Sequence, residues 1–371
     1  MARTGQKPPT QLREPAAVAP RRRVLRRLRG IFAAPAFLLY ALQPAHPASV
    51  ESLRPPALTP PAFEQRTTLG AHFERYAMSR VPRDCLDPAK SNNPDIRRHL
   101  ATIRAARLCY RRETVEEGRF RWMFHLFHHP TERDGPFWLL PHDDENTSFE
   151  VAVYAVDTYG GGFLAIDSGQ RRRFRGQDPN RNFSRSWSES ALCREQASPA
   201  PEYTAAVLGH FKAHRKFPYL SLHNNGDRWA GNGGHGTISV YRSLPILRGF
   251  PSATAVGDFR DEDNLVFVAG LRPYAQDREA QRKVERLNRL GLNVVHKQVT
   301  TRSFNCSLSD FVTRNRLGDY YNVEAQHGRS SVQKAMVDRL MKSLGHRPLR
   351  DSTHDGGPFL GGAPPLPTAG G

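Results

Sequence analysis

The feature that most constrains this fold is an alternation, between residues 66 and 347, of short apolar runs with longer segments of helical periodicity. Each apolar run has the length of a strand, and strands are expected at 120–127, 136–140, 163–166, 219–222, 264–268, 294–299 and 320–325. Helices are expected over 145–157, 202–214 and 332–344. Elements that alternate in this way predict an α/β fold with a mixed, mostly parallel sheet flanked by helices.

A basic and then apolar N-terminus precedes this region. Six arginines lie between residues 21 and 29, an apolar run fills 31–42, and small residues and prolines follow as far as residue 49. This order predicts an export signal over residues 1–48, and therefore a periplasmic or secreted protein. The apolar run is shorter than the about 20 residues that span a membrane, so no stable span is expected. Cleavage of the signal is favoured over its retention as an N-terminal anchor.

Proline and glycine mark two further boundaries. Residues 49–65 are proline-rich and are interpreted as a linker, whereas residues 348–371 combine glycine and proline without apolar periodicity and are expected to be a disordered tail. Residues 66–347 then form one domain of ordinary enzyme size, which is the expected catalytic domain. Nothing in the sequence predicts an oligomeric state.

Four cysteines remain after removal of the export signal, namely Cys85, Cys109, Cys193 and Cys306. An even number in an exported protein predicts two disulfide bonds, and the sequence alone does not choose among the three pairings that four cysteines allow. No two of them have the C-x-x-C spacing, so a cysteine-based zinc site is not expected.

The chain is strongly basic, with a formal net charge of +18. Residues 1–54 hold 10 Lys and Arg against 2 Asp and Glu, so +10 of this charge lies beyond them. A basic protein attracts anionic polymers such as cell-wall material, nucleic acid or acidic lipid. No basic stripe with interleaved aromatic residues and no nucleic-acid motif is present, so a nucleic-acid partner is not expected. The excess of arginine over lysine also fits a proteome that is rich in arginine.

The segment that carries chemistry begins at the end of an expected strand, where two residues separate His142 from Glu145. At the start of a helix this spacing lets both side chains face one ion, and zinc accepts imidazole nitrogen and carboxylate oxygen. The competing interpretation is a helix cap, with Asp143 or Asp144 at the cap position and Glu145 in the first turn. The motif is weak when it stands alone.

A second apolar run ends in His223, which would supply a third ligand at the carboxyl end of a strand. Two histidines and one glutamate leave a fourth position open for water, which distinguishes a catalytic zinc site from a structural one. Asn180 and Arg181 lie in a polar loop, where the guanidinium can hold a carboxylate through two parallel hydrogen bonds. Glu324 lies within an apolar run, where partial desolvation suits it to act as a general base.

In this order, the four segments resemble the zinc carboxypeptidase (funnelin) family over residues 115–345, and the resemblance implies a phosphorylase/hydrolase-like fold. It implies one Zn²⁺ ion bound by His142, Glu145 and His223. Glu324 matches the catalytic glutamate, and Asn180 and Arg181 match the pair that binds the substrate's terminal carboxylate. Arg171, chosen from Arg171, Arg172, Arg173 and Arg175, matches the arginine that polarises the scissile carbonyl. Tyr241 matches the residue that covers the substrate.

The sequence also departs from the digestive members of this family. The stretch between Glu145 and Asn180 is short, and Asn224 and Asn225 follow His223 where the digestive enzymes have a small hydroxyl residue. The chain resembles instead the compact, exported bacterial branch, some members of which trim peptidoglycan peptides. A peptide or muropeptide is therefore the expected substrate.

This resemblance implies a zinc-dependent metallopeptidase that hydrolyses a peptide or amide bond next to a free carboxylate. One alternative keeps the scaffold but acts as an amidase or deacylase on an N-acyl amino acid or a muropeptide. A second alternative is a non-catalytic module that binds cell-wall peptides.

Other histidines offer a rival metal site. His125, His128 and His129 cluster at a strand end, and His129 and Glu132 repeat the spacing of the first motif. No later segment is left to supply a third ligand, so a polar strand end is favoured there. His327 could contact substrate or close a turn.

Overall fold

The computed structural model describes residues 85–193, 201–228 and 236–349. The expected signal or anchor (1–48), the linker (49–65), the first residues of the expected domain and the tail from residue 350 lie outside this part of the chain. The described residues belong to one compact unit, Thr59–Gly371. None of the helices within the described residues has the length and apolar character needed to cross a membrane.

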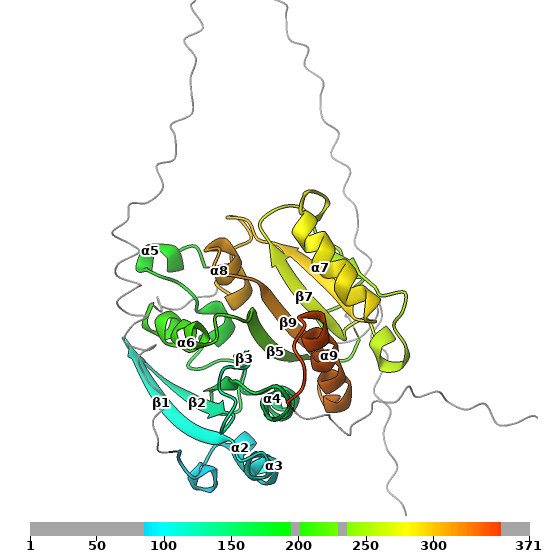
Figure 1. Cartoon of the computed structure of the whole chain (residues 1–371). Coiled ribbons are helices and arrows are strands. Elements are labelled where there is room, and N and C mark those ends of the chain that lie inside the picture. The colour runs from blue at the N-terminus through cyan, green and yellow to red at the C-terminus, as the bar shows by residue number, and fades with distance from the viewer. Residues whose placement is uncertain (1–84, 194–200, 229–235, 350–371) are drawn as a thin grey trace, which may run out of the picture. The chain divides into compact units, whose positions relative to one another are not determined.

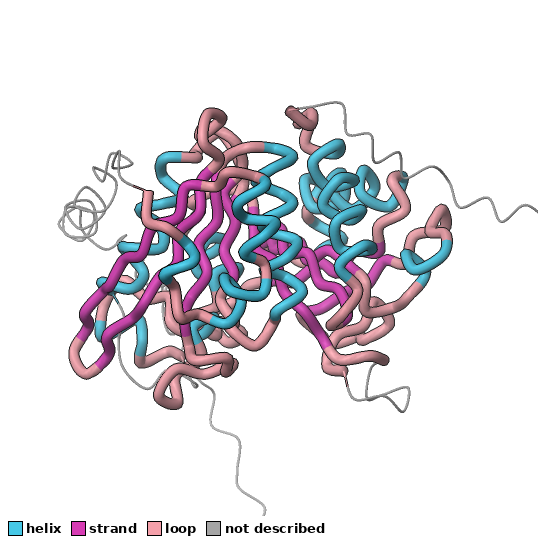
Figure 2. The backbone as a smooth tube through the Cα atoms, turned by 90° about the horizontal axis from the view of Figure 1, so that it is seen from below, coloured by secondary structure: helices cyan, strands magenta, loops and turns pink. Residues whose placement is uncertain are grey.

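A mixed sheet forms the centre of the described region, and its nine strands follow the order β1-β2-β4-β3-β5-β9-β7-β8-β6. The strands are β1 Cys109–Glu117, β2 Phe120–His128, β3 Phe137–Leu140, β4 Gly162–Asp167, β5 Tyr219–Asn225, β6 Leu247–Phe250, β7 Leu265–Gly270, β8 Asn293–Gln298 and β9 Tyr320–Gln326. Figure 2 shows them side by side among the helices. The expected α/β fold with a mixed, helix-flanked sheet is confirmed, but parallel pairs are four of the eight pairings among the described strands, not a majority.

Helices cover both faces of the sheet (Figure 1). On one face, α4 (Asn146–Tyr159) and α9 (Ser330–Ser343) pack against the sheet in the larger core cluster, together with α2 (Pro94–Arg98), α3 (Leu100–Ala105) and α7 (Arg278–Arg289). On the other face, α6 (Pro201–Ala213) and α8 (Leu308–Arg314) enclose a second core rich in aromatic rings. Short elements complete the described chain: α5 Trp187–Ser190 and the 3₁₀ helices Pro88–Lys90, Pro179–Arg181, Gly257–Arg260 and Tyr274–Gln276.

Position in the sheet explains which strands the apolar pattern predicts. Every residue of β3 and β9 is buried, because helices cover both faces of the central strands. All the strands expected from apolar runs are present. The pattern misses the edge strand β1, in which only Cys109, Tyr110 and Val115 are buried and five residues are charged, and the short edge strand β6. It also misses α7, a helix rich in Arg and Glu that buries only Ala280, Val284 and Leu287.

Two disulfide bonds are present, as the even number of cysteines predicts. Cys85 pairs with Cys109 at the start of β1, and Cys193 pairs with Cys306, which lies shortly before α8. The first bond ties a loop to the edge strand β1, and the second joins two loops that are 113 residues apart in the sequence.

The pairing of β5 with β9 sets the position of the expected chemistry. These strands run parallel, and their register places His223 opposite Glu324. Helix α9 fixes the ends of both strands through Gln333, which is fully buried. Its side-chain amide donates to the carbonyl oxygen of His223 at 2.8 Å and accepts from the side chain of Asn224 at 3.1 Å.

Replacing Gln333 by Met should therefore destabilise the fold by about 1–3 kcal/mol, because buried groups of His223 and Asn224 lose their hydrogen-bond partner. Urea unfolding measures this change. The exposed Lys342→Met substitution on the same helix is the control, and it should stay within about 0.5 kcal/mol of the native protein. Equal effects of the two substitutions would contradict the assigned role of Gln333.

Candidate metal centre

The structure brings His142, Glu145 and His223 together, although up to 81 residues separate them in the sequence. Their ligand atoms all lie within 4.8 Å of one another, and all three side chains are buried. Nδ1 of His142 is 2.7 Å from Oε1 of Glu145, and Nδ1 of His223 is 3.0 Å from Oε2 of the same carboxylate. Within the described residues, no other group of three His, Cys, Asp or Glu side chains meets this criterion.

Local structure explains why these side chains point to one place. His142 follows β3 by two residues, and a turn in which the backbone N–H of Glu145 donates to the His142 carbonyl brings Glu145 back beside it. Glu145 occupies the N-cap position of α4, but its side chain makes no capping hydrogen bond. The capping interpretation of this segment therefore fails, because the Glu145 carboxylate faces the histidines and not the first turn of the helix.

Asp178 completes this arrangement and was not assigned a role from the sequence. Its Oδ1 lies 2.9 Å from Nε2 of His142, so the carboxylate fixes the ring from the side opposite Glu145. Asp178 also caps the 3₁₀ helix Pro179–Arg181 by accepting from the backbone N–H of Asn180 at 2.8 Å. The only sequence signal was its place in the Asp-Pro-Asn-Arg loop, two residues before Asn180.

The described residues offer a donor set that fits a divalent metal ion. The two Nδ1 atoms of His142 and His223 lie 3.1 Å apart, and each also faces the Glu145 carboxylate. Imidazole nitrogens this close repel each other if both carry a proton, whereas one cation between them satisfies both lone pairs and the carboxylate. Asp178 on the far nitrogen of His142 matches the carboxylate partner that commonly orients a metal-ligating histidine.

Burial and charge govern the electrostatics of this centre. Burial by itself would lower the pKa of His142, but the Glu145 and Asp178 carboxylates outweigh it and raise the pKa to about 9. Burial would raise the pKa of Glu145, but the two histidines hold it well below its usual range. The metal-free centre is therefore a tightly coupled set of ion pairs.

Glu324 lies in the same cleft as these side chains. Burial raises its pKa, in spite of the opposing charge of His223. One carboxylate oxygen accepts a hydrogen bond from the side-chain amide of Asn322 at 2.9 Å, which fixes its orientation.

The cleft has a cavity volume of about 440 Å³, and Arg181 and His327 line it. Asn180 connects its wall to the metal centre, because its side-chain amide lies 3.4 Å from Nε2 of His223 and its Oδ1 accepts from the backbone N–H of Leu308. The sequence-predicted Asn180 and Arg181 therefore lie at the centre, as does Glu324.

Two of the predicted substrate-binding residues lie elsewhere. Arg171 is exposed and does not line the cleft, whereas its neighbour Arg172 does, with one guanidinium nitrogen 3.0 Å from Oε1 of Glu145. A run of consecutive arginines gives no periodic signal, so only the fold shows which of them turns inward. Tyr241 is 60% exposed and also lies outside the cleft lining.

The rival motif has a structural role. Nδ1 of His129 accepts from the backbone N–H groups of Thr131 and Glu132, which closes a turn after β2. His125 bridges Tyr110 and Asp167 between neighbouring strands. Neither histidine belongs to a metal-binding group of the described chain.

Comparisons with known proteins give no sequence-level match: no protein-family model matches the chain, and no curated protein matches it. Similar solved structures include a candidate metallopeptidase from Shewanella amazonensis (12% identity, 67% of this chain and 91% of that chain, TM-score 0.39). A second is a metallo-carboxypeptidase from Burkholderia cenocepacia (15% identity, 67% of this chain and 69% of that chain, TM-score 0.36). A third is the murein-tripeptide amidase MpaA from Escherichia coli O157 (13% identity, 59% of this chain and 85% of that chain, TM-score 0.30). These are the classes of protein to which the sequence resemblance points. At these identities and TM-scores the likenesses do not decide the activity, which has to be supported by the site.

The metal-free protein should lose stability as the pH rises from 6.5 to about 9. The folded state raises the pKa of His142 from 6.5 to about 9, so its ion pairs contribute fully below pH 6.5 and are lost as the pH rises through 9. The shift corresponds to about 3 kcal/mol. Urea unfolding with a chelator at pH 6.5 and 9 measures this loss, and His142→Gln should remove most of it. The same pH dependence in both proteins would contradict this assignment.

Proposed function

We propose that this protein is a zinc-dependent metallopeptidase of the carboxypeptidase type, which hydrolyses a peptide or amide bond next to a free carboxylate. The observation that carries the proposal is the convergence of His142, Glu145 and His223 beside the buried carboxylate of Glu324. A ligand set of two histidines and one glutamate, with a separate acid-base group in an open cleft, is the arrangement of a catalytic zinc site.

One zinc ion held by these three side chains would lower the pKa of a bound water and polarise a carbonyl group. The chain's own contribution starts with Asp178, which fixes the ring of His142 so that Nδ1 faces Glu145. Gln333 and the pairing of β5 with β9 hold His223 on the opposite side. His223 is therefore positioned by a strand and a helix, and His142 and Glu145 by the hydrogen-bonded turn that joins β3 to α4.

Glu324 is the proposed general base. Its buried carboxylate has a raised pKa, which makes it a better proton acceptor than an exposed glutamate would be. Asn322 holds one of its oxygens, and the other remains available to accept a proton from the attacking water and deliver it to the leaving amine. A group of this kind contributes typically about 10²–10⁴-fold to the rate.

Arginine side chains of the cleft suit an anionic substrate. Arg181 lines the cleft beside Asn180, and its guanidinium can hold a terminal carboxylate in a two-pronged hydrogen bond. Arg172 also lines the cleft and lies 3.0 Å from Glu145, where it can stabilise a carbonyl oxygen as negative charge develops. We therefore transfer the carbonyl-polarising role from Arg171 to Arg172.

The substrate class is proposed to be peptides of the bacterial cell wall. Both disulfides fit an oxidising compartment, in agreement with the exported location expected from residues 1–48. Cell-wall peptides carry several free carboxylates, which suits a cleft lined by Arg172, Arg173 and Arg181. Mass spectrometry of digested peptidoglycan, compared with the digestion of linear peptides and N-acyl amino acids, separates this substrate from the alternatives.

The Glu324→Gln variant should keep one zinc ion per chain and lose about 10²–10⁴-fold in kcat, because it removes proton transfer but leaves all three ligands in place. Elemental analysis and hydrolysis of a peptide substrate measure the two properties. His223→Ala is the matched comparison and should lose the metal as well. Turnover by Glu324→Gln close to that of the native protein would remove Glu324 from the base role, and undiminished zinc in His223→Ala would remove His223 from the ligand set.

The Asp178→Asn variant should bind zinc about 10–100-fold more weakly, since the amide no longer accepts a charge-assisted hydrogen bond from His142. Competition with a chromogenic chelator measures this affinity. Asp144→Asn removes the same charge from the same cleft and is the control, because Asp144 makes no hydrogen bond or ion pair with a proposed ligand. Equal losses in both variants would show that net charge, and not the contact with His142, sets the affinity.

A further inference from the structure

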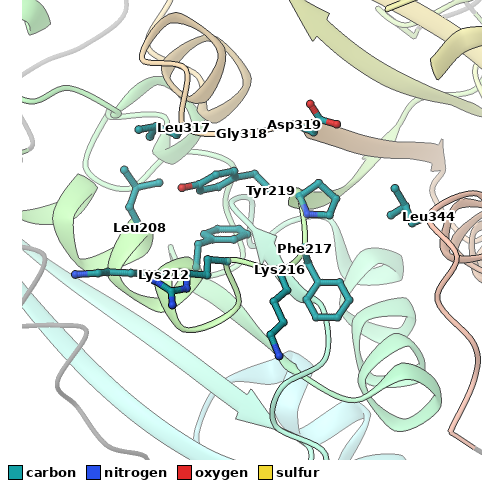
Figure 3. Close-up of a pocket in the computed structure, with 12 residues that line it drawn as sticks. Leu208, Lys212, Lys216, Phe217, Tyr219, Leu317, Gly318, Asp319 and Leu344 are labelled. Atoms are coloured by element: carbon teal, nitrogen blue, oxygen red, sulfur yellow. The ribbon is translucent and has the colours of Figure 1, made fainter. Parts of the chain in front are cut away.

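Two adjoining hollows lie at the end of the central strands β5 and β9 that is opposite the metal centre. The first lies between the end of α6 and the starts of β5 and β9, with a cavity volume of about 400 Å³. Figure 3 shows Tyr219 at its centre, below Gly318 and above Phe217, with the side chains of Lys212 and Lys216 extending away from it. The second, of about 730 Å³, lies between the end of β7, α7 and the end of α8.

The hollows adjoin each other, because Gly318 and Asp319 line both of them. Gly318 has no side chain to divide them, and its φ of 153° is one that residues with a side chain rarely adopt. We call the combined feature the basic groove. Its start at Tyr219 and the metal ligand His223 are four residues apart on β5, so the groove begins about 13 Å from the metal ligand along this strand.

Cations dominate the lining of the basic groove. Eight Lys and Arg side chains line it, against three carboxylates: Lys212, Arg215, Lys216, Arg272, Arg278, Arg282, Lys283 and Arg316, against Asp277, Glu279 and Asp319. The carboxylates are already engaged. Lys283 pairs with Glu279 at 2.8 Å and with Asp319 at 2.5 Å, and Asp277 caps α7.

Five of the cations form no ion pair with a carboxylate of the described residues, namely Arg215, Lys216, Arg272, Arg278 and Arg316. Arg278 is also the first residue of α7, where the helix dipole disfavours a positive charge. Clustered, unpaired cations repel one another, and this repulsion disfavours the folded state. Their combination in one concave feature is explained if an anionic partner neutralises them.

We propose that the basic groove binds the carboxylate-bearing polymer of the cell wall and holds it while one of its peptides enters the catalytic cleft. This inference adds a second binding site to the proposed function and rests on that function for the identity of the polymer. The groove's two adjoining hollows suit a linear polymer that crosses both, whereas a small anion would fill only one of them. A flat membrane would meet the rim of the groove but not its lining.

The disulfides and the position of the groove favour this partner over nucleic acid. Both disulfides fit an oxidising compartment outside the cytosol, where the proposed cell-wall substrate would lie. Two sites that bind one polymer raise each other's effective concentration without any new contact at the catalytic centre. The groove should therefore matter for the insoluble polymer and not for a soluble peptide.

The test measures retention of the full-length protein on purified insoluble peptidoglycan at low and high salt. It uses the Glu324→Gln background, so that hydrolysis does not release the protein. The double substitution Arg215→Glu and Lys216→Glu should weaken binding about tenfold at low salt, because two exposed cations are reversed. Arg97→Glu with Arg107→Glu is the control, since both residues are exposed and lie outside the groove. Amidation of the peptidoglycan carboxylates should abolish the difference between the two variants.

With Glu324 intact, the groove variant should hydrolyse a soluble peptide within about twofold of the native rate, because the groove lies far from the chemistry. Equal retention of the groove and control variants on peptidoglycan would overturn the proposal. So would a groove-dependent preference for a DNA oligonucleotide or for anionic phospholipid vesicles. Groove-dependent retention by a protein that binds no zinc and hydrolyses nothing would instead refute the proposed function and leave the groove's role in place.

Discussion

The parallel pairing of β5 with β9 is the constraint on which the rest of the site depends. Its register sets His223 opposite Glu324, and Gln333 of α9 bonds to both strand ends from the covering layer. A one-residue slip would turn the two side chains to opposite faces of the sheet. The buried hydrophobic core on both sides of these strands therefore fixes the relative position of a proposed metal ligand and a proposed base.

Charge compensation is the second requirement of this centre. His142, Glu145 and Asp178 are buried, and their ion pairs in the metal-free state offset the desolvation cost of each charged group. A cation at the same place would compensate Glu145 and release the proton of His142. The same buried groups thus serve the fold without metal and are suited to serve the chemistry with it. The basic groove at the opposite end of the central strands differs, because five of its cations form no ion pair with a carboxylate of the described residues.

Many elements were predictable from the sequence because the central strands of a sheet covered on both faces must be apolar throughout. The positions of β3, β5 and β9 follow from this pattern, as do the helices α4, α6 and α9. Edge strand β1 and helix α7 escaped because each buries only part of its surface and is otherwise charged. Parallel pairing was overestimated, since apolar runs do not reveal the direction in which a strand joins its neighbour.

The sequence by itself determined that two histidines and a glutamate stand at the ends of apolar runs, with a polar Asn-Arg loop and a late buried carboxylate after them, because side-chain type and strand ends are local properties. Only the tertiary structure decided that Arg172 and not Arg171 lines the cleft, that Asp178 orients His142, that Tyr241 lies outside the cleft lining, and which cysteines pair. These outcomes depend on how segments that are far apart in the chain pack together, and no local sequence pattern encodes that packing.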